Sequence, residues 1–325
     1  MKQIHQEQIA TAVNAVKEKE SIANFYFVGC GGSMAFMKPA AYIFDCEISI
    51  PTTVYNSGEF NTRLPHGLGS NSVVITCSHS GTTPETVEAT KLARKKGAIT
   101  ISLTNEEGSP LWDAAEYPIH YDWGPGTDAS DLNKGLLFGL VFNLLNTVAP
   151  KDTYTKGIEA LNALDTVIQK TKDSFSERVK EWGKSLKREE LIYTMGSGAS
   201  EGECYSFSIC FLMEMQWVHS SYIHSGEYFH GPFEVTDFDV PFIIVKGLGR
   251  TRSLDERAYN FCTKYSEKIY LIDAEEFDMA GIDPEVQEYY TPLLVGSVLR
   301  ILADALAYER GHSLSARRYM WQMEY

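Results

Sequence analysis

The stretch that decides the fold is FYFVGCGGS, residues 25–33, in which a short apolar run leads into a loop of glycine and serine. A second copy, ELIYTMGSGAS, stands at 190–200 and has the same order of apolar run, Gly-x-Gly-x-Ser loop and helix-like sequence. A short apolar run that ends in such a loop is typical of a buried strand followed by a helix. The sequence therefore indicates that one strand–loop–helix unit occurs twice.

A second motif repeats at nearly the same offset. VYNSGEF at 54–60 returns as IHSGEYFHGP at 223–232, so that Glu59 and Glu227 lie 168 positions apart, whereas the serines that close the first motif lie 167 apart. Two motifs preserved at almost one offset predict a duplicated domain. Coincidence between Gly/Ser loops is the alternative, and the matching strand context speaks against it. We expect both glutamates to be structural acids that cap or brace their turns.

Strand-like and helix-like stretches alternate along the chain. Strands are expected at 25–29, 48–55, 72–78, 98–105, 116–122, 190–196, 241–247 and 268–274, and helices at 84–96, 134–148, 203–220, 255–266 and 295–311. Such alternation predicts the α/β class, with mostly parallel sheets flanked by helices. Residues 150–190 are charged and helical in period. We therefore expect an N-terminal domain at 1–150, a helical connector at 151–189 and a C-terminal domain at 190–325.

Composition excludes several classes of function. The formal charge of −14 speaks against nucleic-acid binding, which needs basic patches. The six cysteines form no CxxC pair and read as reduced thiols of a cytoplasmic protein, with no metal site. No signal peptide is evident, and the longest apolar run, at 136–145, is shorter than the roughly 20 residues of a membrane span. We expect neither nucleic acid nor membrane as a partner.

The stretch CSHSGTTPET, residues 77–86, is a candidate phosphate loop. It follows a predicted strand, opens a helix and places four hydroxyls close together, those of Ser78, Ser80, Thr82 and Thr83. Helix N-termini bind anions through free N–H groups, so an acidic protein can hold phosphate here without lysine or arginine. An ordinary Ser/Thr-rich turn is the alternative. The corresponding stretch of the second half, KGLGRTRSLDER, lacks the hydroxyls and is expected to have lost phosphate binding.

A carboxylate and a histidine in the second half are candidates for chemistry. Glu214 lies on the apolar stripe of the helix expected at 203–220. Burial raises the pKa of a carboxyl, as a general base near neutral pH requires, although a structural ion pair with a distant cation is the alternative. His230 follows in EYFHGP, and the alternative is that it is structural, as a lone histidine in an aromatic loop more often is. The gaps among His219, His224 and His230 match no metal motif.

Taken together, these motifs resemble the sugar isomerase (SIS) domain family in its tandem form, which implies two doubly wound, flavodoxin-like domains. GCGGS, NSGEF and CSHSGTTPET carry the resemblance in the first half, and HSGEYFHGP carries it in the second. The stretch MEMQWVHSSYIHSGEYFHGPFEVTD and the ending ARRYMWQMEY look most like the fructosamine-6-phosphate deglycases. The tail has Arg317 and Arg318 but no lysine, unlike the related glucosamine-6-phosphate synthases, which favours deglycation over amination.

The resemblance implies cleavage of a fructose-amino acid 6-phosphate to glucose 6-phosphate and a free amino acid, with no cofactor. Glu214 would move a proton between C1 and C2, and His230 would assist ring opening, reaching the neighbouring subunit's site in a homodimer. The residues that would bind the substrate's phosphate are Ser33, Ser78, Ser80, Thr83 and, through its backbone, His79. An aldose–ketose phosphosugar isomerase and a non-catalytic sugar-phosphate sensor remain alternatives. The amino acid and the role of Arg317 and Arg318 stay open.

Overall fold

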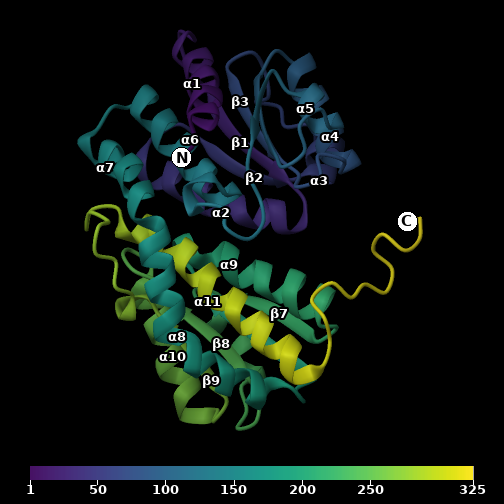
Figure 1. Ribbon diagram of the computed structural model, residues 1–325, viewed down its shortest axis with the longest axis vertical. Coiled ribbons are helices and arrows are strands. Elements are labelled where there is room, and N and C mark those ends of the chain that lie inside the picture. Colours follow the sequence, from purple (N-terminus) through teal and green to yellow (C-terminus); the bar gives the residue numbers. More distant parts are fainter. Residues whose placement is uncertain (325) are drawn as a thin grey trace. The chain divides into compact units, whose positions relative to one another are not determined.

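The structure, a computed structural model, describes residues 1–324 as two compact units. One unit contains Met1–Asp165 together with Ala280–Val286, and the other contains Thr166–Met279 and the chain from Gln287 onward. The main chain therefore returns briefly to the first unit before its last long helix (Figure 1).

The first unit is built on a five-stranded parallel sheet with the order β2-β1-β3-β4-β5. Its strands are β1 Asn24–Gly29, β2 Thr52–Asn56, β3 Ser72–Cys77, β4 Ile99–Thr104 and β5 Tyr117–His120. The chain leaves β1 toward β2 on one side and then returns to β3 on the other, so the order reverses between β1 and β3. Gly29 pairs with Cys77 in this register, which brings the loops after these two strands together. Ligands of doubly wound sheets bind at such a switch point.

Burial explains why these segments form a layered domain. Every residue of β3 and β4 is buried, as is typical of central parallel strands, whereas the edge strands β2 and β5 are only partly buried. Helices α1 Gln3–Lys17, α2 Gly31–Glu47 and α6 Asn133–Val148 cover one face of the sheet. Helices α3 Ser57–Arg63, α4 Pro84–Lys95 and α5 Pro110–Ala114 cover the other (Figure 1), and α7 Asp152–Ala160 packs on α6.

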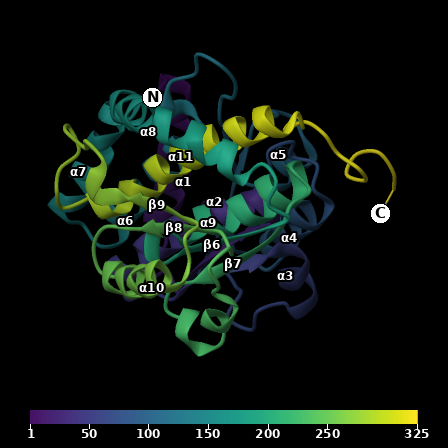
Figure 2. The same cartoon turned by 90° about the horizontal axis from the view of Figure 1, so that it is seen from below.

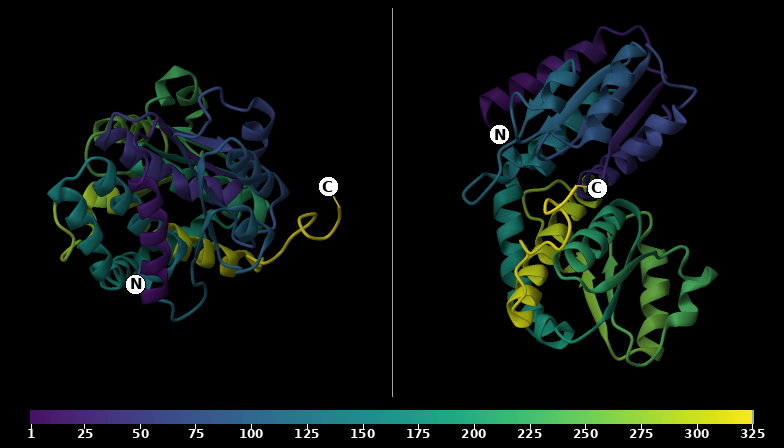
Figure 3. Two further views of the ribbon diagram at one scale, coloured as in Figure 1. Left: turned by 90° about the horizontal axis from the view of Figure 1, so that it is seen from above. Right: turned by 90° about the vertical axis from the view of Figure 1, so that its right-hand side faces the viewer.

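The second unit repeats this plan with four parallel strands in the order β7-β6-β8-β9. They are β6 Leu191–Gly196, β7 His219–His224, β8 Phe242–Lys246 and β9 Ile269–Asp273. The helices are α8 Leu164–Leu186, which begins at the boundary between the units, α9 Glu201–Ser206, a π-helix at Phe207–Met215, α10 Arg252–Tyr265 and α11 Gln287–Arg310. Helix α10 lies on the face of the sheet opposite α11 (Figures 2 and 3). The common strand order confirms two tandem domains of one α/β fold.

The expected helix at 203–220 was wrong in two respects. Its second half is a π-helix that ends at Met215, and the chain then turns at Trp217, whose φ of +56° lies in the left-handed region. The segment after this turn is strand β7, which the sequence analysis missed. Alternation of exposed and partly buried residues along β7 gives it a weak apolar pattern, as is common for an edge strand.

The repeated Ser-Gly-Glu motif is structural, and its glutamates contribute little, since the one ion pair that they form within the described residues, Glu59 with Arg63 at 3.2 Å, is exposed to solvent. The backbone N–H of Gly58 donates to the Asn56 side chain at 2.9 Å, and that of Gly226 donates to His224 Nδ1 at 3.0 Å. In both copies the serine and the aromatic residue are buried, whereas Glu59 and Glu227 are exposed. The capping role expected of the glutamates therefore belongs to the residue that precedes each serine.

Helix α11 is the one helix of the described residues that is long and apolar enough to cross a membrane by length and composition. Its most apolar window is 61% buried inside the structure, as in a core helix of a globular unit. The sequence analysis expected a helix at 295–311 but no membrane span there, because polar residues within it interrupt every continuous apolar run.

We expect the substitution of glycine by alanine to have opposite effects on stability at two positions of α6. A Cβ at Gly135 would lie 2.2 Å from the Ala129 carbonyl oxygen, whereas at Gly139 the nearest atom, at 2.9 Å, is the flexible end of Met1. Gly135→Ala should therefore lower the free energy of unfolding by about 1–3 kcal/mol through overpacking. Gly139→Ala should leave it unchanged or raise it by up to about 1 kcal/mol through helix propensity. Urea unfolding of both variants checks this, and equal effects would contradict the packing of α6.

Candidate functional site

The candidate phosphate loop lies at the carboxyl end of β3, beside the loop that follows β1. Thr83 is the N-cap residue of α4 and Pro84 its first residue, as the sequence predicted. The Thr83 hydroxyl does not cap the helix and instead pairs with the Ser78 hydroxyl at 2.8 Å. The Ser80 and Thr82 hydroxyls pair at 2.7 Å. The loop thus holds two hydroxyl pairs next to the N–H groups of a helix N-terminus, which is a set of neutral donors for an anion.

Gly81 fixes the shape of this loop. Its φ is +65°, a conformation that favours glycine, and its N–H donates to the Ser78 carbonyl at 3.1 Å. A Cβ at this position would lie 1.9 Å from Ser109 Oγ. Only glycine therefore lets the chain fold tightly enough to turn Ser78 and Ser80 toward the helix N-terminus.

His79 is tied to the sheet by its backbone and to an aromatic neighbour by its ring. Its carbonyl accepts from the N–H of Asn105 at 3.1 Å, and its Nδ1 lies 3.0 Å from the Tyr121 hydroxyl. The ring packs against the edge of Trp123. Partial burial lowers the pKa of His79 from its ordinary value, with Glu106 opposing the shift. The His79 ring therefore supports the loop from one side, and its partial burial favours the neutral form of the imidazole.

Ser33 lies in the first turn of α2, next to Cys77, the last residue of β3, and so close to the candidate phosphate loop. The hydroxyls of Ser33 and Tyr121 lie beside the Cys77 thiol. Burial raises the pKa of Cys77 to about 12, and these hydroxyls offset only part of that rise. Cys77 is thus a buried, unreactive thiol that packs under the loop. The hydroxyls of Ser33, Ser78 and Thr83 all lie at this one edge of the sheet.

The equivalent edge of the second unit holds an acid where the first has hydroxyls. Asp255 is fully buried in α10 and accepts from the Ser197 hydroxyl at 2.7 Å and from the Gly247 N–H at 3.1 Å. Burial raises the pKa of Asp255, while these hydrogen bonds oppose the rise. Because an internal carboxyl already uses the donors of this loop, the site is unsuited to phosphate, in line with the expectation for the second half.

Glu214 is carried by the π-helix Phe207–Met215. The π-helix ends with the N–H of Gln216 donating to the Phe211 carbonyl, five residues back, at 3.0 Å. π-Helical turns are rare and frequently lie at functional sites, since they displace a side chain from its α-helical position. The π-helix therefore determines which side chains surround Glu214, and the Cys210 thiol is among them.

The environment of Glu214 combines desolvation with one cation. Its side chain is 24% exposed, and Oε1 lies 2.8 Å from Nη2 of Arg317, which is 7% exposed. Burial raises the pKa of Glu214 above its ordinary value, and the Arg317 guanidinium offsets part of that rise. The nearby Cys210 thiol has a pKa raised to about 11, first by burial and then by the Glu214 charge. Glu214 is thus a carboxyl of raised basicity that also has an ion-pair partner.

The segment around Glu214 is held in place by residues 310–318, the end of α11 and the stretch after it, which we call the strap. The Gln216 side chain donates to the His312 carbonyl at 2.8 Å, and Arg310 donates to the Gln216 carbonyl at 3.3 Å. Trp217 packs edge-on against the His312 ring, and the Arg318 guanidinium lies 4.4 Å from the centre of the Trp217 ring. Sequence reasoning left the role of the tail open, because contacts between residues 94 to 101 positions apart have no local signal in the sequence.

His230 is exposed at the end of the short 3₁₀ turn Tyr228–His230. The turn that carries His230 is anchored, because Tyr228 is fully buried in an aromatic cluster with Phe229, Phe233 and Phe261. Gly231, with a φ of +135°, redirects the chain directly behind the histidine. None of the hydrogen bonds among the described residues joins the His230 ring to Glu214. The structure thus presents His230 outward and does not pair it with Glu214.

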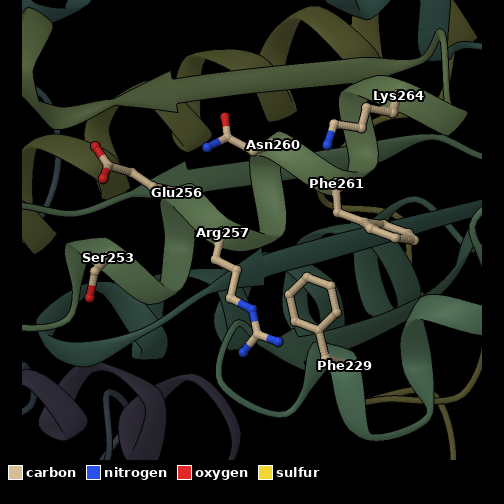
Figure 4. Close-up of a pocket in the computed structure, with 7 residues that line it drawn as sticks. All are labelled: Phe229, Ser253, Glu256, Arg257, Asn260, Phe261 and Lys264. Atoms are coloured by element: carbon tan, nitrogen blue, oxygen red, sulfur yellow. The ribbon is translucent and has the colours of Figure 1, made fainter.

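Two other places in the molecule hold polar groups but none of the predicted site residues. His5, His120 and Asp122 bring possible metal-ligand atoms within 4.8 Å of one another, but the Lys2 ammonium lies 2.6 Å from Asp122 and His5 Nδ1 lies 2.7 Å from Asp131. A hollow of about 500 Å³ lies along α10, where the Arg257 guanidinium stacks on Phe229 (Figure 4). Its lining residues are Phe229, Ser253, Glu256, Arg257, Asn260, Phe261 and Lys264.

The chain is similar to known proteins in sequence and in fold. The model of the SIS domain matches residues 20–148. The chain is 48% identical to a fructosamine deglycase of Bacillus subtilis, over 94% of either chain. It is 28% identical to a fructoselysine 6-phosphate deglycase of Escherichia coli, over 94% of this chain and 89% of the relative.

A solved structure of similar sequence has the same fold throughout. The crystal structure of a candidate phosphosugar isomerase from Bacillus subtilis is 46% identical and superposes over the full length of both chains with a TM-score of 0.96. The similarity of sequence and of structure to this protein extends over the whole of both chains. The chain therefore belongs to the SIS domain family and is an enzyme of that family.

Proposed function

We propose that the protein is a deglycase that cleaves a fructose-amino acid 6-phosphate to glucose 6-phosphate and a free amino acid. The observation that carries the proposal is Glu214, a carboxylate kept partly out of water on a π-helix, with its pKa raised by burial. Two relatives that match nearly the whole chain are named as deglycases of fructosamine and of fructoselysine 6-phosphate. A cytoplasmic location is part of the proposal, and the six free cysteines favour it.

In the proposed reaction the 6-phosphate binds Ser33, Ser78, Ser80 and Thr83, with the His79 backbone and the α4 N-terminus adding donors. Glu214 removes a proton from C1 of the open-chain substrate, which gives an enolamine, and a proton is then delivered to C2. The product is an imine of glucose 6-phosphate. Water adds to this imine and releases the amine, so that the carbon–nitrogen bond breaks without any redox partner.

His230 is proposed to move the proton that opens the sugar ring, in the site of a second copy of the chain. The exposed His230 ring stands on a turn that is anchored by aromatic packing, and it is therefore suited to a contact outside its own unit. The proposal therefore includes a homodimer whose two sites each take a histidine from the partner.

The proposal is tested with a panel of fructose-amino acid 6-phosphates, with glucose 6-phosphate and free amino acid measured together. Equal release of both products supports it. Interconversion of fructose 6-phosphate and glucose 6-phosphate, with no release from any panel member, would instead favour an isomerase, the activity suggested for the structural relative. Absence of both activities would support a sugar-phosphate sensor.

The first prediction concerns Glu214. Glu214→Gln keeps the size of the side chain but removes the base, so kcat should fall by at least about 100-fold. In the unmodified protein, activity should also fall on the acid side as the pH drops through the raised pKa of Glu214. Glu181→Gln, at an exposed position of α8, is the matched control and should keep full activity. A Glu214→Gln protein with near-normal kcat would overturn the assignment.

The second prediction concerns the phosphate loop. Ser78→Ala removes one donor to a charged group, so KM should rise by about 10- to 100-fold with kcat little changed. The inhibition constant of inorganic phosphate should rise by a similar factor, which separates phosphate binding from effects on the chemistry. Ser176→Ala, on the exposed side of α8, is the control. An unchanged KM and unchanged inhibition would place the phosphate elsewhere.

The third prediction concerns His230 and the dimer. Glu214→Gln and His230→Ala should each be nearly inactive alone. If His230 serves the neighbouring site, mixed dimers contain one complete site, and random subunit exchange should restore up to about a quarter of wild-type activity. Mixing under conditions that exchange subunits, followed by the glucose 6-phosphate assay, makes the test. No gain of activity despite proven exchange would mean that both residues act within one subunit.

A further inference from the structure

The guanidinium of Arg317 is held in a fixed position next to Glu214. Its Nη1 donates to the carbonyls of Leu314 and Ala316, each at 2.8 Å, while Nη2 faces Glu214 Oε1 at 2.8 Å. The side chain is 7% exposed, and its Cζ lies 5.2 Å from the centre of the Trp321 ring. The backbone of the tail therefore orients this cation, and the ion pair with Glu214 uses only one of its nitrogens.

One nitrogen of this guanidinium, Nε, has no acceptor within the described part of the chain. Arg317 Nε is buried and makes no hydrogen bond among the described residues. A guanidinium offers parallel N–H groups that match both oxygens of a carboxylate, and the Nε–Nη2 edge is one such pair. Since a buried donor without a partner is unfavourable, the bare Nε marks a place for an acceptor from outside the protein.

The strap and Gln216, which it contacts, contain further buried polar atoms without partners. Gln216 Oε1, Arg310 Nε and His312 Nε2 are in this state, and direct contacts link their residues to one another. Arg310, Arg317 and Arg318 also concentrate positive charge at the end of α11, in a chain of net charge −14. The unpartnered Arg310 Nε–H and the three guanidinium charges fit an anionic group of a ligand better than they fit a closed core, whereas Gln216 Oε1 is an amide oxygen that can only accept a hydrogen bond.

We propose that Arg317 binds the α-carboxylate of the amino acid portion of the substrate through Nε and Nη2, an inference that rests on the proposed deglycase function. In a sugar attached to an α-amine, the carboxylate carbon is three bonds from C1. A base that acts on C1 and a cation that holds this carboxylate must therefore be neighbours, as Glu214 and Arg317 are. In a sugar attached to the ε-amine of lysine, the carboxylate lies several bonds farther away.

Two consequences follow for the site. The substrate's carboxylate displaces Glu214 from the guanidinium, so the base loses the cation that weakens it only when substrate is bound. The preferred substrates are sugars attached to the α-amine of an amino acid. Amines without a carboxylate, and ε-linked lysine, leave Arg317 paired with Glu214 and react more slowly.

The test compares two phosphorylated substrates that differ only in the carboxylate, the α-linked alanine adduct and the ethylamine adduct of fructose 6-phosphate. In the wild-type enzyme, kcat/KM should be about 10- to 100-fold higher for the alanine adduct. Arg317→Met should bring this ratio close to one, and Arg317→Lys should restore part of it. Arg300→Met, at an exposed position of α11 where the guanidinium pairs with Asp304, is the matched control and should keep the wild-type ratio.

Three results would overturn the inference. A wild-type ratio near one would do so without any variant, so the test survives a variant that fails to fold. A wild-type ratio retained in folded Arg317→Met would also do so. Failure of the wild-type enzyme to release glucose 6-phosphate from either adduct and from the wider panel would refute the proposed function itself, and this inference with it.

Discussion

The ion pair between Glu214 and Arg317 joins the parts of the second unit on which the proposed chemistry depends. The carboxylate sits on a π-helix that displaces it from α-helical spacing, and the cation comes from the tail beyond α11. Burial raises the pKa of Glu214, and the Arg317 guanidinium offsets part of that rise, so two opposing effects set the basicity of this carboxyl. The contact of His312 in the strap with Gln216 fixes this balance, because it ties the end of the π-helix to the tail.

Duplication explains how one fold carries two kinds of site. Both units place a loop at the carboxyl end of the strand next to the switch in strand order, as β3 and β8 show. In the first unit the loop keeps hydroxyls and an open helix N-terminus, which suits an anion. In the second unit, Asp255 uses the equivalent donors internally. The first copy is thus suited to binding a phosphate, whereas the carboxylate proposed to be the base lies in the second copy.

Much of the fold could be predicted from the sequence, because central strands such as β3 are continuous apolar runs and Thr83-Pro84 is a clear helix start. The π-helix and β7 could not, since apolar spacing does not distinguish a π-turn from an α-turn and an edge strand has a weak pattern. The candidate residues of the phosphate loop follow from local sequence. The pairing of Glu214 with Arg317 does not, since it joins residues 103 positions apart. The capping roles of Asn56 and His224 could not be predicted from the repeat, because the residue before the serine differs between the two copies whereas the glutamate is common to both.

The proposed mechanism requires that one C1–H bond of the substrate breaks and that the product is an aldose. The most direct measurement uses a fructose-amino acid 6-phosphate with two deuterium atoms at C1, and mass spectrometry and NMR of the sugar phosphate released in ordinary water. The account predicts glucose 6-phosphate with a single deuterium at C1, because the base removes the other. Fructose 6-phosphate that retains both deuterium atoms would contradict it, since that product requires direct displacement at the carbon–nitrogen bond.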